Sequence, residues 1–169
     1  MATAYIGIGS NIDPERNVRA TIRLLRESTR IVNISTVYCT EPVGSPELEP
    51  FYNGVVEIET DTSPRELKFA VLRNIEQTLG RTRSSDKYAP RTVDLDIIVY
   101  GDAVISEPDL IIPDPEIAAR AFIAVPLFEL APDLLLPGSG LRLADVVKTL
   151  RTDSMVPLTE FTRALREEI

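Results

Sequence analysis

Residues 89–101 read APRTVDLDIIVYG, and the stretch VDLDIIVY at 93–100 has the β-branched and aromatic composition of a strand. Two aspartates interrupt it, although strands disfavour this residue. Strict alternation sends Val93, Leu95, Ile97 and Val99 to one face of the sheet and Asp94, Asp96, Ile98 and Tyr100 to the other. Because the first set needs a core, the sequence predicts that the two carboxylates lie side by side on the opposite face.

The elements before this strand alternate between strands and helices. Residues 63–80 predict a helix, because Ser63 and Glu66 form a capping box, Pro64 takes the first helical position and Gly80 follows the last turn. Apolar periodicity and turn residues predict a strand over 3–9, a helix over 13–29, a second strand over 30–40 and a third over 51–60. Two proline- or arginine-rich loops, 40–50 and 81–91, interrupt this regular pattern.

The resulting order, β-α-β-β-α-β, predicts an α+β protein with a ferredoxin-like sheet and both helices on one face. The other face and its loops are then free for ligands. The apolar, proline-punctuated last third is expected to pack around the sheet as a C-terminal extension, with residues 151–169 forming an amphipathic or frayed tail. With 44% hydrophobic residues in 169, a single domain over residues 1–169 is expected.

The composition restricts partners and chemistry. A formal net charge of −8 argues against general binding to nucleic acid or anionic membranes. A single cysteine permits no internal disulfide, and no targeting or membrane segment is recognisable, so a cytoplasmic protein is expected. The absence of histidine excludes Ser-His catalysis and His-ligated metals, which leaves oxygen ligands for Mg²⁺, Mn²⁺ or Ca²⁺.

The loop at 81–91, RTRSSDKYAPR, leads directly into the two aspartates. Its four basic residues and one aspartate give a local charge of 4 − 1 = +3 in an acidic chain. Arginine offers bidentate donors to phosphate oxygens, and paired carboxylates suit Mg²⁺ bound to a polyphosphate. A solvated charge run and a pair of merely exposed aspartates are the alternatives. The chain has no GxxxxGK[ST] loop, so it is not a P-loop enzyme.

Two phenylalanines are candidate platforms for a planar ligand. Phe51 shares a strand face with Asn53, so that a ring and an amide lie together, and Phe122 is the second ring. A heterocycle could lie between the rings while the amide contacts its edge. Taken singly, each ring is far more typical of a core position than of a ligand platform.

The stretch KYAPRTVDLDIIVYG (87–101) resembles the signature of the 6-hydroxymethyl-7,8-dihydropterin pyrophosphokinase family, enzymes of folate biosynthesis. AYIGIGSN, YCTEPVG, FYNGVVEIET, IEQTLGR and RAFIAVPLFELAP match the family in the same order. The resemblance covers roughly residues 4–138. It implies a ferredoxin-like monomer that uses two Mg²⁺ ions to transfer the terminal pyrophosphate of ATP to the pterin hydroxymethyl oxygen, releasing AMP.

The resemblance also implies roles for individual residues. The catalytic residues are Arg81, Arg91, Asp94 and Asp96, and the two aspartates are the Mg²⁺ ligands. The pterin contacts are Thr40, Val43, Phe51, Asn53 and Phe122. The nucleotide contacts are Glu76, Arg81, Arg83, Tyr88, Arg91, Ile97 and Arg120.

One position departs from the family pattern. Many relatives have histidine after the proline of IIPDPEIAAR (111–120), where this chain has Asp114. An extra carboxylate beside the phosphates predicts weaker ATP binding, unless Asp114 points away or pairs with Arg120. Rival hypotheses are a non-catalytic pterin- or nucleotide-binding relative, another metal-dependent phosphotransferase or nucleotidyltransferase on this fold, and a structural scaffold.

Overall fold

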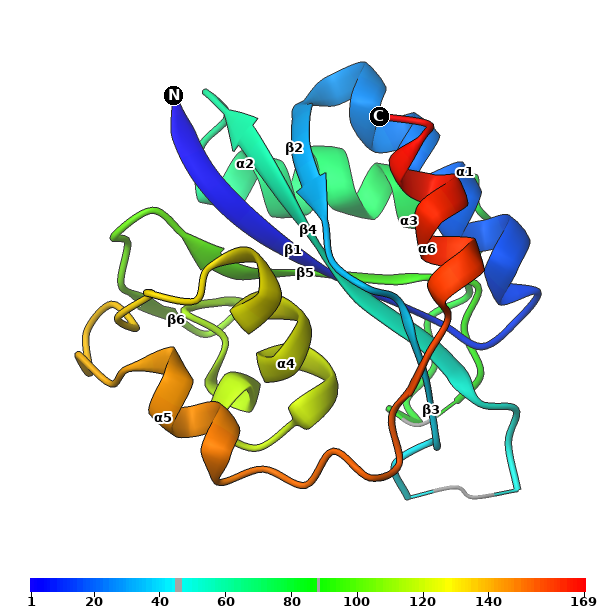
Figure 1. The fold of residues 1–169 in the computed structure, drawn as a ribbon. Coiled ribbons are helices and arrows are strands. Elements are labelled where there is room, and N and C mark those ends of the chain that lie inside the picture. Colours follow the sequence, from blue (N-terminus) through cyan, green and yellow to red (C-terminus); the bar gives the residue numbers. More distant parts are fainter. Residues whose placement is uncertain (45–46, 88) are drawn as a thin grey trace.

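An antiparallel sheet of six strands runs through the centre of the molecule (Figure 1). The computed structural model describes residues 1–44, 47–87 and 89–169. The strands are β1 (Ala2–Ser10), β2 (Arg30–Ile34), β3 (Tyr38–Thr40), β4 (Phe51–Thr60), β5 (Asp94–Tyr100) and β8 (Val156–Pro157). Their order is β5-β1-β4-β3-β8, and β2 also pairs with β4. A separate hairpin consists of β6 (Ile105–Glu107) and β7 (Leu110–Ile112).

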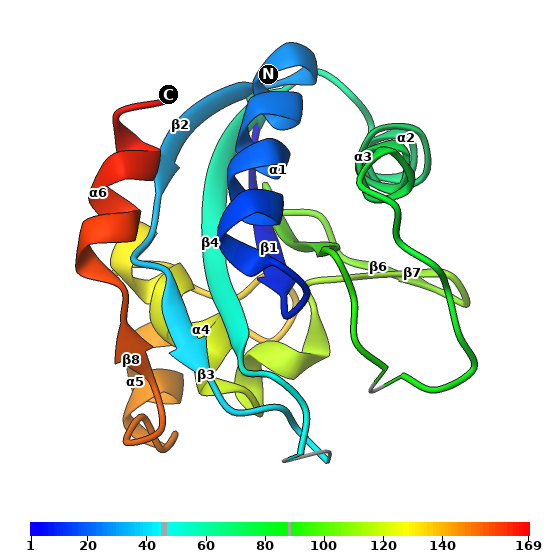
Figure 2. The same cartoon turned by 90° about the vertical axis from the view of Figure 1, so that its right-hand side faces the viewer.

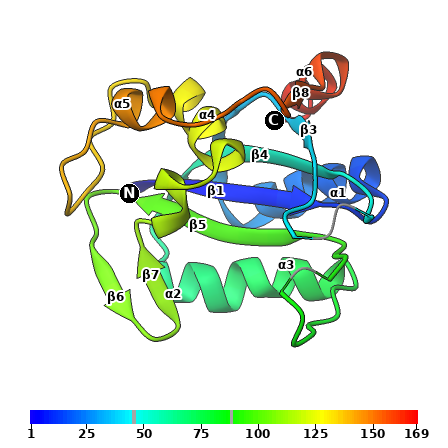
Figure 3. The same cartoon turned by 90° about the horizontal axis from the view of Figure 1, so that it is seen from below.

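Helices lie on both sides of this sheet (Figure 3). One side carries α1 (Pro14–Ser28) and a continuous helical run made of α2 (Pro64–Glu66), the π-helical η1 (Leu67–Leu72) and α3 (Arg73–Thr78). The other side carries η2 (Pro115–Ala118), α4 (Ala121–Leu130) and α5 (Leu143–Lys148). Finally, α6 (Thr159–Arg166) lies beside α1 and β2. Among the described residues, no helix has the length and apolar character needed to cross a membrane.

The two sides of the sheet hold two separate cores. The first contains Ile6, Ile22, Leu25, Ile58, Leu67 and Leu95, among others. The second contains Val55, Ile98, Val99, Ala124, Leu127 and Leu143, among others, and joins the sheet to α4 and α5. The predicted mixture of helices and antiparallel sheet is therefore confirmed. The second face is not left open, however, because α4 and α5 cover part of it.

A bulge in β5 corrects the predicted alternation. The register with β1 runs from Tyr5↔Val99 to Ile6↔Ile97, so Ile98 has no partner of its own. An unpaired residue reverses the facing of everything that follows it. Val99 therefore joins Ile98 in the second core, whereas Tyr100 packs against the first. The prediction was right up to Ile97 and wrong for the two residues after the bulge.

The other elements follow the sequence with local differences. The strand expected over 30–40 is divided into β2 and β3, because Ser35 bonds the backbone of Val55 and interrupts the ladder. The helix expected over 63–80 begins at Pro64 as predicted, and the hydroxyl of Ser63 accepts from the Glu66 N–H at 3.3 Å. Residues 151–169, expected as an amphipathic or frayed tail, contain β8 and α6. Strand β8 pairs with β3, and α6 contacts β2 and α1.

Candidate functional site

A cleft of about 280 Å³ lies where β1, β4 and β5 meet the loops after β3 and α3. The sequence-predicted residues that line it are Thr40, Val43, Phe51, Asn53, Arg91, Asp94, Asp96, Arg120 and Phe122. They come from four separate stretches of the chain, 40–43, 51–53, 91–96 and 120–122. The cleft thus joins the predicted aromatic positions with the predicted carboxylate positions.

Gly9 of β1 lines the cleft, and Gly7 lies two residues before it on the same strand. Gly9 pairs with Asp94 on one side and Asn53 on the other, and Gly7 pairs with Asp96. A Cβ on Gly9 would lie 3.0 Å from Asn53 Oδ1, so only glycine leaves the amide and the cleft their present space. The sequence prediction did not include Gly9. Its signal is the alternation of Gly7 and Gly9 in AYIGIGS, in step with the aspartates of the neighbouring strand.

Asp94 is held by two arginines of the preceding loop. Arg81 Nη1 donates to Asp94 Oδ1 at 2.6 Å, and Arg91 Nη1 donates to Asp94 Oδ2 at 2.9 Å. The backbone of Arg91 is in turn fixed by Asn11, whose Oδ1 accepts from the Arg91 N–H at 2.8 Å. Both catalytic arginines predicted from sequence therefore contact the same carboxylate.

Glu76 of α3 binds Arg81, Arg83 and the backbone of β5. Its buried carboxylate accepts from Arg81 Nη1 at 2.7 Å, from Arg83 Nη2 at 2.7 Å and from the Leu95 N–H at 2.9 Å. Burial lowers the pKa of Arg81, but the carboxylates of Asp94 and Glu76 more than offset this and raise that pKa overall. Glu76 does not line the cleft, so it positions the arginine rather than presenting itself to a ligand.

Asp96 carries the most perturbed carboxyl of the site. Burial and, to a lesser extent, the negative charges of Asp94 and Asp114 raise its pKa from 3.8 to about 7, while Lys68 acts in the opposite direction. Water reaches the side chain through the mouth of the cleft. The negative charges of Asp94 and Asp114 nearby make its charged form costly without a cation.

Asp114 lines the same cleft, at the start of η2. Its Oδ1 accepts from the Glu116 N–H at 2.8 Å, and burial raises its pKa. Arg120 Nε donates to Glu116 Oε2 at 2.8 Å, and no ion pair between Arg120 and Asp114 occurs in the described part of the chain. The pairing considered for Asp114 from sequence is thus absent there, and its carboxylate faces the other two aspartates across the cleft.

The opposite end of the cleft is aromatic and carries the amide. Phe51 lies beneath the Arg91 guanidinium, 5.9 Å from its ring centroid. Asn53 Nδ2 donates to the Thr40 hydroxyl at 2.6 Å, and both residues are buried. This bond leaves Asn53 Oδ1 as the free amide atom beside Gly9. Phe122, the second ring, enters from the first turn of α4.

The remaining nucleotide positions are distributed differently. A second depression of about 220 Å³ is lined by Arg81, Arg83 and Arg91, together with Thr82, Ser84, Asp86, Lys87, Ala89 and Pro90. The Ile97 side chain is buried in the first core, which leaves only its backbone available to a ligand. Tyr88 lies outside the described residues.

The carboxylates of the cleft fit a hard divalent cation. Within residues 1–44, 47–87 and 89–169, no three acidic or cysteine side chains cluster closely enough to hold a metal by themselves. Asp94 and Asp96 supply two oxygen donors, and Mg²⁺ commonly uses one or two carboxylates with water and phosphate oxygens completing the shell. A carboxylate has about four lone-pair positions, so Asp94 retains capacity beyond its two arginines.

The chain is similar to proteins of one family over most of its length. A family model described as 7,8-dihydro-6-hydroxymethylpterin-pyrophosphokinase matches residues 5–132. The 2-amino-4-hydroxy-6-hydroxymethyldihydropteridine pyrophosphokinase of Haemophilus influenzae is 37% identical over 161 residues, 94% of this chain and 99% of that protein. The protein of the same name from Bacillus subtilis is 39% identical over 130 residues, 75% of this chain and 77% of that protein.

Solved structures give the same fold. The wild-type Plasmodium falciparum HPPK-DHPS with SDX-DHP matches 88% of this chain with a TM-score of 0.67 at 14% identity. A triple mutant of that protein with STZ-DHP gives a TM-score of 0.71 at 13% identity. The chain spans only 43% of each of those longer chains. At such identities the likeness concerns the fold alone.

Proposed function

Since the chain belongs to the 7,8-dihydro-6-hydroxymethylpterin-pyrophosphokinase family, whose members are the pyrophosphokinases of folate synthesis, we propose that its cleft transfers pyrophosphate from ATP to the pterin. The observation that supports this most strongly is the meeting of an aromatic-amide end and a carboxylate-arginine end in one cleft. A pterin needs the first and a metal-bound polyphosphate needs the second. We also interpret the strand order as ferredoxin-like, and we propose that the chain acts as a monomer, as the family resemblance implies.

The pterin occupies the aromatic end in this proposal. Phe51 and Phe122 enclose the flat ring system, and stacking on aromatic faces favours such a ligand. Asn53 Oδ1 accepts a hydrogen bond from the ring edge, because the bond from Nδ2 to Thr40 fixes the amide with Oδ1 beside Gly9. Thr40 and Val43 contribute the wall from the loop that follows β3.

The triphosphate occupies the charged end. Arg91 lines the cleft and can exchange part of its bond to Asp94 for phosphate oxygens, while Arg81 remains supported by Glu76. Arg83 contributes positive charge from the neighbouring loop, and Arg120 from the start of α4. Asp94 and Asp96 would hold Mg²⁺, which when bound neutralises phosphate charge and makes the attacking hydroxyl more acidic.

The transfer itself is an in-line displacement. The hydroxymethyl oxygen of the pterin forms a bond to the β-phosphorus of ATP, and the bond from that phosphorus to the α,β-bridging oxygen breaks. AMP leaves with the bridging oxygen, and the hydroxyl proton passes to solvent. The residues named above orient both substrates and stabilise charge, which is most of what phosphoryl-type transfer asks of a protein. Asp114 adds a negative charge beside the phosphates, and we propose that it lowers the affinity for ATP.

Product analysis tests the proposed function directly. The chain is incubated with MgATP in the presence and absence of 6-hydroxymethyl-7,8-dihydropterin, and the nucleotides are separated by chromatography. We expect AMP and a pyrophosphorylated pterin, formed only when the pterin is present. Formation of ADP would identify an ordinary kinase and contradict the proposal, and tight pterin binding without turnover would favour the non-catalytic relative.

Replacing Gly9 by Ala is expected to weaken pterin binding selectively. The new Cβ would lie 3.0 Å from Asn53 Oδ1 and 3.8 Å from Phe51 Cδ1, so the amide must move away from its partner on the ligand. We expect the KM for the pterin to rise about tenfold, which corresponds to losing roughly one hydrogen bond, with the KM for ATP nearly unchanged. Steady-state kinetics with each substrate varied in turn measures both constants.

Gly54→Ala is the matched control for that variant. A Cβ on Gly54 would meet no atom closer than 3.4 Å, which is ordinary van der Waals contact. If both glycine variants raise the KM for the pterin equally, the effect comes from the sheet in general and the role assigned to Gly9 is wrong.

A further inference from the structure

The C-terminal segment formed by β8 and α6 is joined to the strand that bears the pterin-side hydroxyl (Figure 2). Val37, between β2 and β3, has both of its backbone groups satisfied by this segment. Its N–H donates to the Thr162 hydroxyl at 2.9 Å, and its carbonyl accepts from the Leu158 N–H at 2.8 Å. Val37 and Thr162 are both buried, so water cannot replace either bond.

The same segment completes the sheet on the outer edge of β3. Cys39 pairs with Val156 of β8, while Thr40 pairs with Phe51 of β4. Short strands are weakly held when only one edge is paired. Strand β3 has only three residues, so pairing on both edges fixes it more firmly than β4 could alone.

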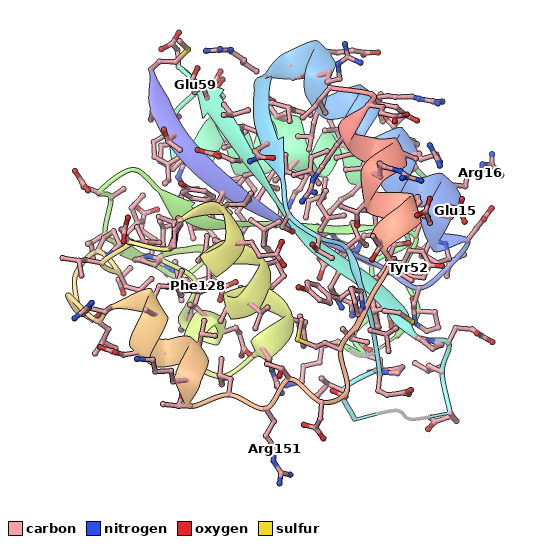
Figure 4. All side chains as sticks on the ribbon, in the orientation of Figure 1. Glu15, Arg16, Tyr52, Glu59, Phe128 and Arg151 are labelled. Carbon is pink, nitrogen blue, oxygen red and sulfur yellow. The ribbon has the colours of Figure 1, made fainter. Side chains whose placement is uncertain are left out.

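The helix that carries Thr162 is itself firmly attached. Phe161 packs edge-on against Tyr52 with 5.6 Å between ring centroids. Figure 4 labels Tyr52 near the lower end of α6. Arg19 of α1 lies over the other side of the Phe161 ring, 5.3 Å from its centroid, and its Nη1 donates to Glu168 at 2.7 Å. Helix α6 therefore forms a fixed support on α1 and β4 from which Thr162 holds Val37.

This support leads by short steps to the cleft. The Thr162 hydroxyl accepts from the Val37 N–H, Val37 directly precedes β3, and Thr40 is the last residue of that strand. The Thr40 hydroxyl accepts from Asn53 Nδ2 at 2.6 Å and so decides which amide atom is left for the ligand. A shift of β3 by a few tenths of an ångström would lengthen this bond and free the amide to turn.

We infer that Thr162 is a positioning residue for the pterin end of the cleft, acting from α6 through Val37 and β3 on the Thr40–Asn53 pair. The inference rests on the proposed function for the identity of the ligand. It gives the segment beyond residue 150 a role in substrate affinity, although no residue of that segment lines the cleft within the described chain.

Thr162→Val tests the inference with little change in volume. Valine keeps the shape but offers no acceptor, so the buried N–H of Val37 loses its partner. We expect the dissociation constant of the pterin, measured with the non-hydrolysable α,β-methylene analogue of MgATP present, to rise about tenfold. The affinity for the nucleotide analogue should change less than about twofold, and Thr162→Ser should restore pterin affinity because it restores the hydroxyl.

A second measurement separates positioning from general stability. Hydrogen exchange at the backbone amides of residues 37–40 should be faster in Thr162→Val than in the unaltered chain. Ile22→Val, a one-methylene truncation in the first core, is the control and should lower stability without changing pterin affinity. The inference is contradicted if Thr162→Val leaves pterin affinity unchanged or weakens the binding of both ligands equally. It is also contradicted if Ile22→Val lowers pterin affinity to the same extent.

Failure of the two proposals gives different results. If the unaltered chain binds no pterin at all, the proposed function is wrong and the role in pterin affinity falls with it. Faster exchange at residues 37–40 would still show that Thr162 holds Val37. If the unaltered chain binds pterin and only the exchange rate responds to Thr162→Val, the proposed function stands and the positioning role is overturned.

Discussion

Replacing Asp96 by Asn is expected to lower kcat by about a thousandfold while the chain remains folded. The variant keeps the shape of the side chain and removes one of the two carboxylates that would hold Mg²⁺ beside the phosphates. Asp96 is exposed in the cleft and accepts no hydrogen bond from the described residues, so its charge has no structural task there. Product formation under saturating MgATP and pterin measures the loss.

The stability of the same variant, relative to the unaltered chain, should increase as the pH rises from 4 to 8. The pKa of Asp96 is about 7 in the folded chain and near 3.8 when the group is unperturbed. Between these values the folded chain retains a proton that the unfolded chain has released, so the free energy of unfolding falls as pH rises through this window. Asparagine does not titrate. The melting temperature of Asp96→Asn relative to the unaltered chain should therefore increase from pH 4 to pH 8, as thermal unfolding across that range would record.

Asp102→Asn is the matched control, because Asp102 is an exposed aspartate in the turn that follows β5. It should leave both kcat and the pH dependence of stability unchanged. An Asp96→Asn enzyme with near-normal turnover would show that the second carboxylate is not needed. A variant that melts earlier than the unaltered chain at pH 8 would show instead that the charge stabilises the fold.

Periodicity and capping predicted much of the fold, and a bulge limited the rest. The capping residue Ser63 and the shared face of Asp94 and Asp96 depend on local sequence, which is why they agree with the structure. The bulge at Ile98 depends on how β1 pairs with β5, and nothing within 93–100 announces it. The division of 30–40 into two strands likewise arises from a contact with Val55, twenty residues away.

The candidate site shows the same limit. A family pattern could name Asp94, Arg81 and Arg91, but the ion pairs that join them require the fold to bring α3 and β5 together. Glu76 matched a nucleotide position from sequence, whereas the structure places it beneath the cleft as an acceptor for Arg81. Its role became visible only from burial and hydrogen bonding, because a glutamate in a helix of this composition is indistinguishable from a surface residue.

Glu76→Gln should reduce stability by about 3 kcal/mol and activity by about tenfold to a hundredfold. The buried carboxylate accepts from three donors, those of Arg81, Arg83 and the Leu95 backbone. An amide has one acceptor oxygen, and its NH₂ group would face an arginine. Arg81 would then keep only its bond to Asp94, and its charge would lose one of the two carboxylates that compensate it in this largely buried position. Urea denaturation and steady-state kinetics measure the two effects.

The losses of stability and of activity in Glu76→Gln share one cause only if Glu76 acts through Arg81. A double-mutant cycle of these two residues tests this. Arg81→Gln alone removes the positive partner, so adding Glu76→Gln to it should cost less than it does in the unaltered chain. We expect a coupling free energy above about 1 kcal/mol, as for residues within one buried network. Glu66→Gln, an exposed change in the same helical run, should cost no more than about 0.5 kcal/mol. Additive effects in the cycle would mean that Glu76 supports the fold through Leu95 and Arg83, and that Arg81 keeps its place at Asp94 without it.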